Sequence, residues 1–420
     1  MQTDYDIAII GGGLVGAALA CALGDSTLRI GVIESQPAAP MSPGKGEVER
    51  GRERISTAVD KYDVRVSAIT LASRALFENI GVWKIMPAQH ISPLREMHVW
   101  DAQGPGMIHF DAADLGEPEL GYIIENRVLL AAMLERMAQF ANVNFLCPAE
   151  VASLRREPGA VVIELQDGGE RRAGLVVGAD GAHSVIRKWT GIRNHGWSYD
   201  QRAIVATVTT ALPHNATAWQ VFLPTGPLAF LPLVGGASSI VWSCDSEHAA
   251  MLLELDDGRF IGELHAAFGD RLGAIESIGR RLDYPLALAH ADLYIDERIV
   301  LIGDAAHRVH PLAGQGVNLG LLDAATLTQV VLDAVANKKD IGTRAVLRRY
   351  ERWRKGDNLA MLAVTDVFKR GFGSQRRPLV ALRNAGLNIV DRLGPLKTLL
   401  MRYAVGLEGD LPMLARSKQR

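Results

Sequence analysis

Three glycine-rich segments hold the residues best suited to chemistry, and the last of them is the most informative. Asp304 follows the apolar segment 298–302 and precedes the glycine-rich run 311–320. A carboxylate at the carboxyl end of a parallel strand lies where open α/β sheets bind ligands, and it can accept hydrogen bonds from ligand hydroxyls. Backbone N–H groups that could stabilise a negatively charged ring of a bound ligand would come from Gly314, Gly316 and a helix beginning near Val317.

The first segment lies near the N-terminus and has the pattern of a nucleotide-binding turn. Residues 5–10 form an apolar run typical of a buried parallel strand. Gly11, Gly13 and Gly16 follow with G-x-G-x-x-G spacing, which provides a tight turn, close approach to a pyrophosphate and close packing of helix on strand. Residues 14–24 are small and apolar, and they predict a helix whose N-terminus faces the pyrophosphate.

Glu34 ends a second apolar strand, 28–33, at a position where a carboxylate can accept ribose hydroxyls. The acid argues against NADP, because it would repel the 2′-phosphate. It does not separate NAD from FAD. A glycine-rich turn in an unrelated α/β protein could share the spacing, but the order strand, turn, helix, strand and acid favours a dinucleotide.

A middle segment, 178–187, follows the apolar strand 173–177 and contains Asp180. With one nucleotide signature near the N-terminus, a second almost 300 residues later and this segment between them, the pattern indicates FAD held from both ends.

These three segments, in this order, resemble the single-component FAD-dependent aromatic hydroxylases, the group typified by p-hydroxybenzoate hydroxylase. Further segments closely resemble the ubiquinone-biosynthesis hydroxylases within that group, so the resemblance covers nearly the whole chain. These segments are residues 65–69, 121–126, 226–233, 310–320, 383–387 and 403–407.

The resemblance implies a set of cofactor contacts. The ADP half of FAD would be held by Gly11, Gly13, Gly16 and Glu34, with Val151 beside the adenine. Arg65 and Asn126 would lie near the pyrophosphate and ribityl chain, Asp180 would be linked to both FAD and the pyridine nucleotide, and Asp304, after Gly303, would bind ribityl hydroxyls. The isoalloxazine would be bordered by residues 311–318, which include Pro311, Gly314, Gly316, Val317 and Asn318.

No side-chain nucleophile and no cluster with metal-ligand spacing is evident in the sequence, so it predicts no metal site and leaves the catalytic residues unknown. That fits a flavin enzyme, in which the cofactor carries the chemistry. The resemblance implies that NAD(P)H reduces the flavin and that a C4a-hydroperoxide then hydroxylates an aromatic ring, in a site that excludes water. His307 belongs to the flavin motif and is interpreted as structural; His310 is given no role.

The expected fold is α/β: a Rossmann-like FAD-binding domain of the glutathione-reductase type, an inserted antiparallel-sheet substrate domain and a C-terminal helical region. The FAD-binding domain is discontinuous and comprises residues 1–72, 104–190 and 290–345. The substrate domain comprises 73–103 and 191–289, and the helical region comprises 346–420.

Residues 203–243 read as successive strands broken by Pro and Gly turns, which suggests an antiparallel sheet beside the substrate. Trp219, Phe222, Phe230 and Trp242 either line the substrate pocket or form ordinary sheet core. Residues 37–63 are rich in Pro, Gly and charge and are expected to be a surface loop, either a tolerated insertion or a lid.

The C-terminal region is basic, with 17 Lys and Arg against 6 Asp and Glu from 344 to 420. Apolar residues are interleaved, so this region could contact an anionic membrane or an acidic partner; the alternative is a solvated face over an internal packing layer. A polyprenylated substrate would make peripheral membrane contact useful. The sequence therefore predicts a cytoplasmic protein and leaves contact at the periphery of the inner membrane open.

Composition sets outer bounds on function. A net charge of −2 gives no reason to expect nucleic acid, and 48% hydrophobic residues suit a globular protein. The cysteines are far apart, as expected of reduced thiols, and no signal peptide or apolar run of spanning length is predicted.

Three functions remain open from sequence. The first is hydroxylation of a polyprenylated phenol, with membership of a ubiquinone-biosynthesis complex and homo-oligomerisation left open. The second is hydroxylation of a small soluble aromatic compound. The third is a non-catalytic flavin-binding subunit of a biosynthetic complex. The ring carbon, NADH versus NADPH and prenyl length cannot be read from the sequence.

Overall fold

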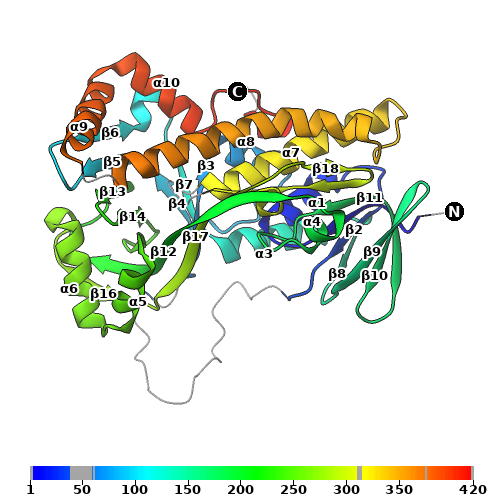
Figure 1. The fold of residues 1–420 in the computed structure, drawn as a ribbon, viewed down its shortest axis with the longest axis horizontal. Helices are drawn as coiled ribbons and strands as arrows, with labels where there is room; N and C mark the ends of the chain where they lie inside the picture. Colours follow the sequence, from blue (N-terminus) through cyan, green and yellow to red (C-terminus); the bar gives the residue numbers. More distant parts are fainter. Residues whose placement is uncertain (1–2, 38–58, 60–61, 310–314, 374–375, 418–420) are drawn as a thin grey trace.

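Two large sheets dominate the computed structural model, which describes residues 3–37, 59, 62–309, 315–373 and 376–417 (Figure 1). One sheet is mainly parallel and the other mainly antiparallel. A small third sheet joins them. Most of the expected loop 37–63, together with His310, Pro311 and Gly314, lies outside the described residues.

The parallel sheet is built from the apolar runs that the sequence marked as buried strands. Its order is β18-β19-β11-β1-β2-β8, with β1 parallel to both β11 and β2. The hairpin β9–β10 adds to β11 in antiparallel fashion. The strands are β1 (Tyr5–Ile10), β2 (Ile30–Ile33), β8 (Val143–Leu146), β9 (Val151–Glu157), β10 (Ala160–Leu165), β11 (Glu170–Gly178), β18 (Ile295–Asp296) and β19 (Ile299–Leu301).

Helix α1 (Leu14–Leu23) packs against both α3 (Asn126–Met137) and α7 (Gln315–Ala336). Their apolar side chains form the largest hydrophobic core with those of the parallel strands, because strands of this sheet are apolar on both faces. Among the described residues α7 is also long and apolar enough to cross a membrane, but 67% of that stretch is buried inside the protein, as in a core helix.

The antiparallel sheet has the order β20-β17-β12-β15-β14-β13-β5-β6, with β16 beside β12. One face of this sheet is covered by α5 (Ser246–Glu254) and α6 (Asp257–Phe268), whose apolar side chains form a second core with it. The strands are β5 (Glu96–Asp101), β6 (Met107–Asp111), β12 (Asn194–Thr210), β13 (Thr217–Leu223), β14 (Gly226–Pro232), β15 (Ser238–Asp245), β16 (Ile275–Ile278), β17 (Leu282–Ala291) and β20 (His307–Arg308). The strands expected within 203–243 are thus confirmed.

The third sheet pairs β7 (Gly121–Glu125) with β3 (Val66–Thr70) and β4 (Ile91–Leu94), and α2 (Leu71–Asn79) follows β3 directly. Short helical turns connect the remaining segments: α4 (Val185–Thr190), η1 (Ala88–His90), η2 (Ala112–Leu115), η3 (Asp270–Leu272), η4 (Gly303–Ala305) and η6 (Met413–Ala415).

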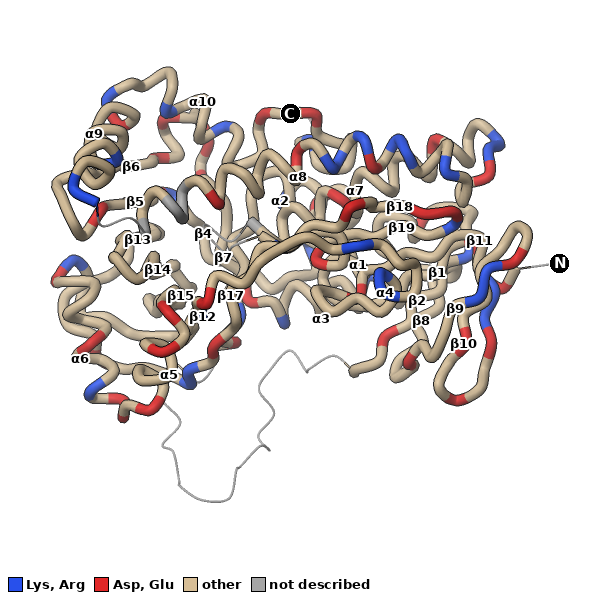
Figure 2. The backbone as a smooth tube through the Cα atoms, viewed as in Figure 1, with Lys and Arg blue, Asp and Glu red and all other residues tan. Residues whose placement is uncertain are grey.

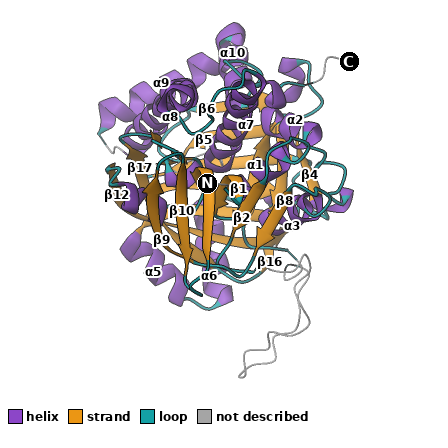
Figure 3. Ribbon diagram, turned by 90° about the vertical axis from the view of Figure 1, so that its right-hand side faces the viewer, coloured by secondary structure: helices purple, strands orange, loops and turns teal. Residues whose placement is uncertain are grey.

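The expected C-terminal helical region is confirmed. Helix α8 (Arg344–Gly373) runs along the molecule from the parallel to the antiparallel sheet, and α9 (Arg377–Arg392) and α10 (Gly394–Ala404) follow it (Figure 1). Viewed along the long axis, the strands lie between α7–α10 on one side and α5 and α6 on the other (Figure 3).

The α/β fold class is therefore as expected, whereas the division into domains remains a prediction. Strand pairing crosses the boundary expected at residue 104, because β6 pairs with β5 as the edge of the antiparallel sheet. Helix α2, expected in the substrate domain, contributes Leu76 and Phe77 to the core of the parallel sheet.

Candidate active site

The turn between β1 and α1 has the geometry of a phosphate cradle. Gly11 has φ +105°, and a Cβ there would lie 2.4 Å from the Ala179 carbonyl oxygen; a Cβ on Gly16 would lie 1.9 Å from the Gly11 carbonyl oxygen. A Cβ on Gly13 would meet nothing within 4 Å. Gly13 is also the N-cap of α1, and no side chain caps this helix. The turn thus leaves open space in front of free N–H groups, where an anion is stabilised.

Glu34 lies beside this cradle. One carboxylate oxygen, Oε2, accepts a hydrogen bond from the Gly12 amide at 2.7 Å, and the other, Oε1, accepts one from Gln36 at 2.8 Å. The Ala149 amide donates to the Glu34 carbonyl at 2.8 Å, which brings the start of β9, with Val151, close to the same edge of the sheet. Val151 and Glu34 therefore lie near one edge of the sheet, and their contact with the ADP half of FAD stays a prediction.

Asp180 follows β11, the strand that pairs with β1. Its Oδ2 accepts hydrogen bonds from the Val185 and Ile186 amides at 2.7 and 3.1 Å. Its Oδ1 is buried and has no hydrogen-bond partner among the described residues. A buried carboxylate oxygen without a partner is costly, and a ligand hydroxyl or water would satisfy it.

The second glycine motif brings Asp304 to the end of β19. Gly303 has φ +60°, a left-handed conformation that favours glycine, and its turn directs the chain into η4. Asp304 lines a cavity. Desolvation by the surrounding protein raises the pKa of its carboxyl, and the charges of His307 and Arg308 oppose that shift.

A cavity of about 440 Å³ brings five of the predicted cofactor residues together. They are Arg65, Asn126, Asp304, Gly316 and Val317. Arg65 and Asn126 are adjacent across the third sheet, where the Asn126 amide donates to the Arg65 carbonyl at 2.9 Å. The volume lies within the usual range of ligand pockets.

The opposite wall of the same cavity is one face of the antiparallel sheet. Its lining is largely apolar, with a few polar side chains. The residues of β12–β15 and β17 that line this wall include Ala203, Val205, Ala218, Gln220, Ala229, Leu231, Ser239, Val241, Ser243, Tyr284 and Leu286.

The four aromatic residues considered as pocket lining do not line it; the alternative interpretation as sheet core is correct. Trp219, Phe230 and Trp242 pack in or against the core under α5 and α6, and Phe222 packs in a small core with Phe372. Side chains alternate between the two faces of a strand, so Ala218 and Gln220 beside Trp219, and Val241 beside Trp242, face the cavity.

Asn318 fixes the start of α7 against the third sheet. Its side-chain amide donates to the Ala68 carbonyl at 2.7 Å, and its Oδ1 accepts from the Thr70 amide at 3.0 Å and from the Ser73 hydroxyl at 2.7 Å. The Asn318 side chain therefore positions the helix N-terminus, while its predicted contribution to the flavin site stays a prediction.

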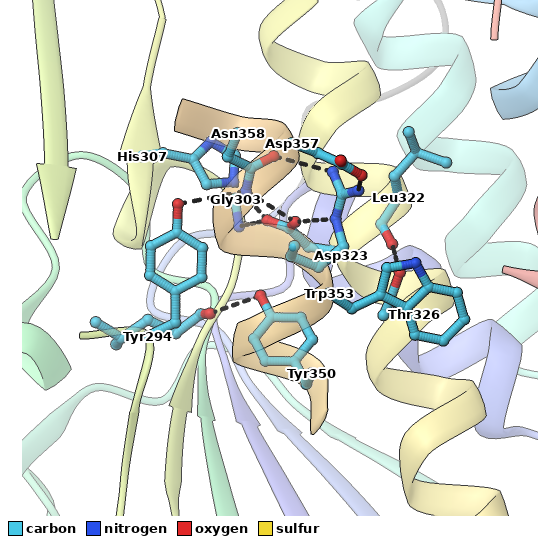
Figure 4. A network of polar contacts seen from close by, with 12 residues as sticks. Tyr294, Gly303, His307, Leu322, Asp323, Thr326, Tyr350, Trp353, Asp357 and Asn358 are labelled. Carbon is cyan, nitrogen blue, oxygen red and sulfur yellow. Dashed lines mark hydrogen bonds and ion pairs between the residues drawn. The ribbon is translucent and has the colours of Figure 1, made fainter. Parts of the chain in front are cut away.

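Sequence reasoning missed a buried polar network behind the second glycine motif (Figure 4). Asp323 of α7 accepts hydrogen bonds from the Gly303 amide at 3.0 Å and from His307 at 2.5 Å through Oδ2, and from Arg354 of α8 at 2.9 Å through Oδ1. Burial alone would raise the pKa of Asp323, but the charges of His307 and Arg354 outweigh it and lower the pKa to about 2. The carboxylate therefore stays charged and ties the Gly303 loop to two helices.

His307 is almost fully buried, which agrees with its interpretation as structural. A signal for the network was present in the sequence, since Asp323 is the only charged residue from 315 to 332. A charge inside an otherwise apolar helix requires a buried partner.

Comparison with known proteins points in the same direction as this geometry. A family model described as "FAD binding domain" matches residues 4–360. The ubiquinone hydroxylase UbiL of Rhodospirillum rubrum is 40% identical over 402 residues, which cover 96% of this chain and 89% of that protein. The 3-demethoxyubiquinol 3-hydroxylase of Escherichia coli is 36% identical over 402 residues, covering 96% and 98% of the two chains.

The fold is also similar to that of a solved structure. The crystal structure of p-nitrophenol 4-monooxygenase PnpA from Pseudomonas putida aligns with a TM-score of 0.75 at 20% sequence identity, covering 96% of this chain and 99% of that one. At that identity the match supports the fold alone.

Proposed function

This chain belongs to the FAD binding domain family, and from that membership we propose that it is an FAD-dependent monooxygenase that hydroxylates the aromatic ring of a polyprenylated phenol in ubiquinone biosynthesis. One observation carries the proposal most directly. Residues predicted to contact the cofactor and a largely apolar sheet face border the same cavity. Cofactor and ring would therefore share one cavity.

The residues fit FAD at both ends of the site. The open space at Gly13 and the uncapped start of α1 suit the pyrophosphate, and the unpartnered Asp180 Oδ1 offers an acceptor. Asp304 would accept hydrogen bonds from ribityl hydroxyls. When bound, FAD supplies the redox chemistry: it takes electrons from a reduced donor, NAD(P)H in this proposal, and activates O2 for transfer of one oxygen atom to a ring.

The protein's own contribution is to enclose and orient the ring. Leu231, Val241 and Leu286 make the cavity wall apolar, which keeps water away from the reacting centre. Ser239 lines the cavity but is only 1% exposed, and its buried hydroxyl has no partner among the described residues, so it would have to turn toward the cavity to bind a polar group of the substrate. Burial raises the pKa of Tyr284, whose hydroxyl therefore stays protonated as a second donor.

Ubiquinone biosynthesis is tested by a quinone-lipid profile of cells that lack this gene. We expect one polyprenylated intermediate that lacks a ring oxygen to accumulate, and the wild-type gene to restore ubiquinone. The missing oxygen would identify the ring carbon. An unchanged ubiquinone pool in a strain without a paralogue would reject this substrate class.

Purified FAD-loaded protein separates the remaining candidates. A short-chain prenylated phenol should accelerate NAD(P)H oxidation and gain one oxygen atom from ¹⁸O2. Acceleration by soluble phenols alone would favour a small aromatic substrate, and no oxidation with any of them would favour a non-catalytic subunit.

We also propose a peripheral membrane contact through α9 and α10. The cavity is too small for a long polyprenyl chain in addition to two ring systems, so the tail must extend beyond it. Both helices expose large apolar residues, among them Leu382 (68%), Ile389 (55%) and Tyr403 (58%). Basic residues lie between them and along α8 (Figure 2). This combination suits an anionic lipid surface.

Flotation with vesicles tests that contact. The protein should float with vesicles containing anionic phospholipid, and Leu382→Glu with Ile389→Glu should reduce the bound fraction severalfold. Met251 is 51% exposed on α5, so Met251→Glu is the matched control. Equal binding of the two variants would contradict the assignment to α9. Membership of a complex and homo-oligomerisation remain predictions.

A further inference from the structure

Glu96, His98 and His109 converge on one face of the hairpin β5–β6. His98 and His109 are direct cross-strand partners, and Glu96 lies two positions before His98, on the same face. The other face carries Met97, which lines the cavity, and Val99, which packs in a small core. The cluster therefore lies outside the active site, on the reverse side of one of its strands.

The three side chains bring their ligand atoms close enough to share one ion. Glu96 Oε2 is 2.9 Å from His109 Nε2 and 3.5 Å from His98 Nε2, and all three atoms lie within 4.8 Å of one another. Bonds of about 2.0–2.2 Å in a tetrahedral zinc site put neighbouring ligands roughly 3.3–3.5 Å apart. The His98 and His109 rings are stacked almost parallel, with centroids 4.2 Å apart, so the His109 ring would have to turn out of the stack for both Nε2 atoms to face one ion.

Stacking on Trp219 holds the His98 ring in place. The His98 ring lies between Trp219 of β13 and His109, with ring centroids 4.5 and 4.2 Å away. The side chains of Glu96, His98 and His109 are 40%, 23% and 36% exposed, so an ion can reach them from solvent.

Nearby cations limit the affinity. The Arg271 guanidinium lies over the Trp100 ring, 4.2 Å from its centroid, and over Trp219 at 6.0 Å. Lys397 reaches the His109 carbonyl but is paired with Asp114 at 2.8 Å. With one carboxylate and two neutral imidazoles as ligands, the site suits a borderline divalent ion better than Mg²⁺ or Ca²⁺, which prefer several oxygen ligands.

We propose that Glu96, His98 and His109 form a site for a divalent transition-metal ion of the Zn²⁺ class, with water as the fourth ligand. The sequence predicted no metal site, because the ligand set appears only once the strand register pairs His98 with His109. The ion would join the edge strand β6 to β5. It would thereby stabilise the hairpin whose Asp101 and Gly106 hold Arg383 and Asn384 of α9.

Metal titration of the tag-free, FAD-loaded full chain tests the proposal without requiring turnover. Calorimetry should show one equivalent of Zn²⁺ bound by the metal-stripped wild type, and Co²⁺ should give the visible absorption of a four-coordinate site. Wild-type protein that shows neither saturable Zn²⁺ binding nor such a spectrum would overturn the proposal, whatever the variants do.

Variants assign the ligands. His98→Gln, His109→Gln and Glu96→Gln should each weaken binding at least tenfold with FAD content unchanged. His195→Gln is the matched control, since His195 pairs with Asp292 at 2.7 Å elsewhere. If Glu96→Gln, the variant closest in shape to the wild type, bound Zn²⁺ with unchanged affinity and stoichiometry, the assignment would be wrong.

Trp219 provides an independent readout, because it stacks on His98. Ni²⁺ or Cu²⁺ should quench part of the tryptophan fluorescence, and Trp219→Phe should remove that component while retaining Zn²⁺ binding. Identical quenching in Trp219→Phe and wild type would place the bound ion elsewhere and contradict the proposal.

Discussion

His307 donates a hydrogen bond of 2.5 Å to the Asp323 carboxylate, and both side chains are almost fully buried. The same carboxylate accepts from Arg354 of α8 and from the Gly303 amide (Figure 4). One buried charge therefore joins the loop that carries Asp304 to α7, whose first turn borders the cavity, and to α8.

Asp323→Asn should destabilise the protein strongly, because Arg354 is 2% exposed and would lose its buried charge partner. Breaking a buried ion pair by removing one partner costs about 3–5 kcal/mol. We expect a lower melting temperature and a reduced FAD content, since the Gly303 loop loses its anchor.

Asp333→Asn is the control on the same helix. Asp333 pairs with Arg349 over 3.0 Å, and both side chains are well exposed. An exposed pair contributes about 0–1 kcal/mol. Equal losses of stability and FAD in the two variants would show that the buried network has no special role.

The pKa of about 2 for Asp323 predicts how its contribution depends on pH. The unfolded chain binds the proton more tightly than the folded chain, so the ionised carboxylate stabilises the fold above about pH 4, and this stabilisation is lost as pH falls toward 2. The difference in urea-unfolding free energy between wild type and Asp323→Asn should therefore be constant from pH 7 to 5 and shrink below pH 4. A difference that grew on acidification would contradict this assignment.

Gly13 and Gly16 should respond differently to alanine. Gly13 has φ −68°, and a Cβ there meets no atom within 4 Å, so Gly13→Ala should fold normally. Its methyl group would occupy the space proposed for the pyrophosphate and weaken FAD binding by tenfold or more. Gly16→Ala places a Cβ 1.9 Å from the Gly11 carbonyl oxygen and should lower stability itself.

Thermal melts and FAD titrations of the apoprotein separate the two effects. If Gly13→Ala bound FAD like the wild type, the cradle would not be the phosphate site.

The sequence predicted the parts of the site whose signal is local. An apolar strand directly precedes the glycine-rich turn 11–16, Glu34 and Asp304. In each case the strand and the residue after it are encoded within one short segment. The parallel sheet then had to bring them to one edge, because the carboxyl ends of parallel strands lie together.

Features that depend on pairing between distant segments were not predictable in the same way. The pattern of residues 203–243 predicted strands, but it did not tell which face of the sheet borders the cavity. That depends on α5 and α6, which cover the other face. The His98–His109 pair required the register of β5 on β6. Arg354 becomes the partner of Asp323 only when α8 packs on α7.

Adjacent serines on β15 give a matched test of the substrate cavity. Ser238 and Ser239 are each 1% exposed, and neither hydroxyl has a partner among the described residues, but only Ser239 lines the cavity. Ser239→Ala removes a donor that we expect to bind a polar group of the substrate, which is worth about 0.5–1.5 kcal/mol, or roughly 2- to 12-fold in kcat/KM. Ser238→Ala should leave kcat/KM unchanged, and neither change should affect FAD binding.

Steady-state kinetics with a short-chain prenylated phenol would measure this difference, together with the fraction of NAD(P)H oxidation coupled to product. Loss of a substrate hydrogen bond should raise KM or lower coupling in Ser239→Ala alone, because a poorly oriented ring leaves reduced cofactor to react without hydroxylation. Equal kinetics for the two serine variants would mean that this strand face does not contact the polar part of the ring.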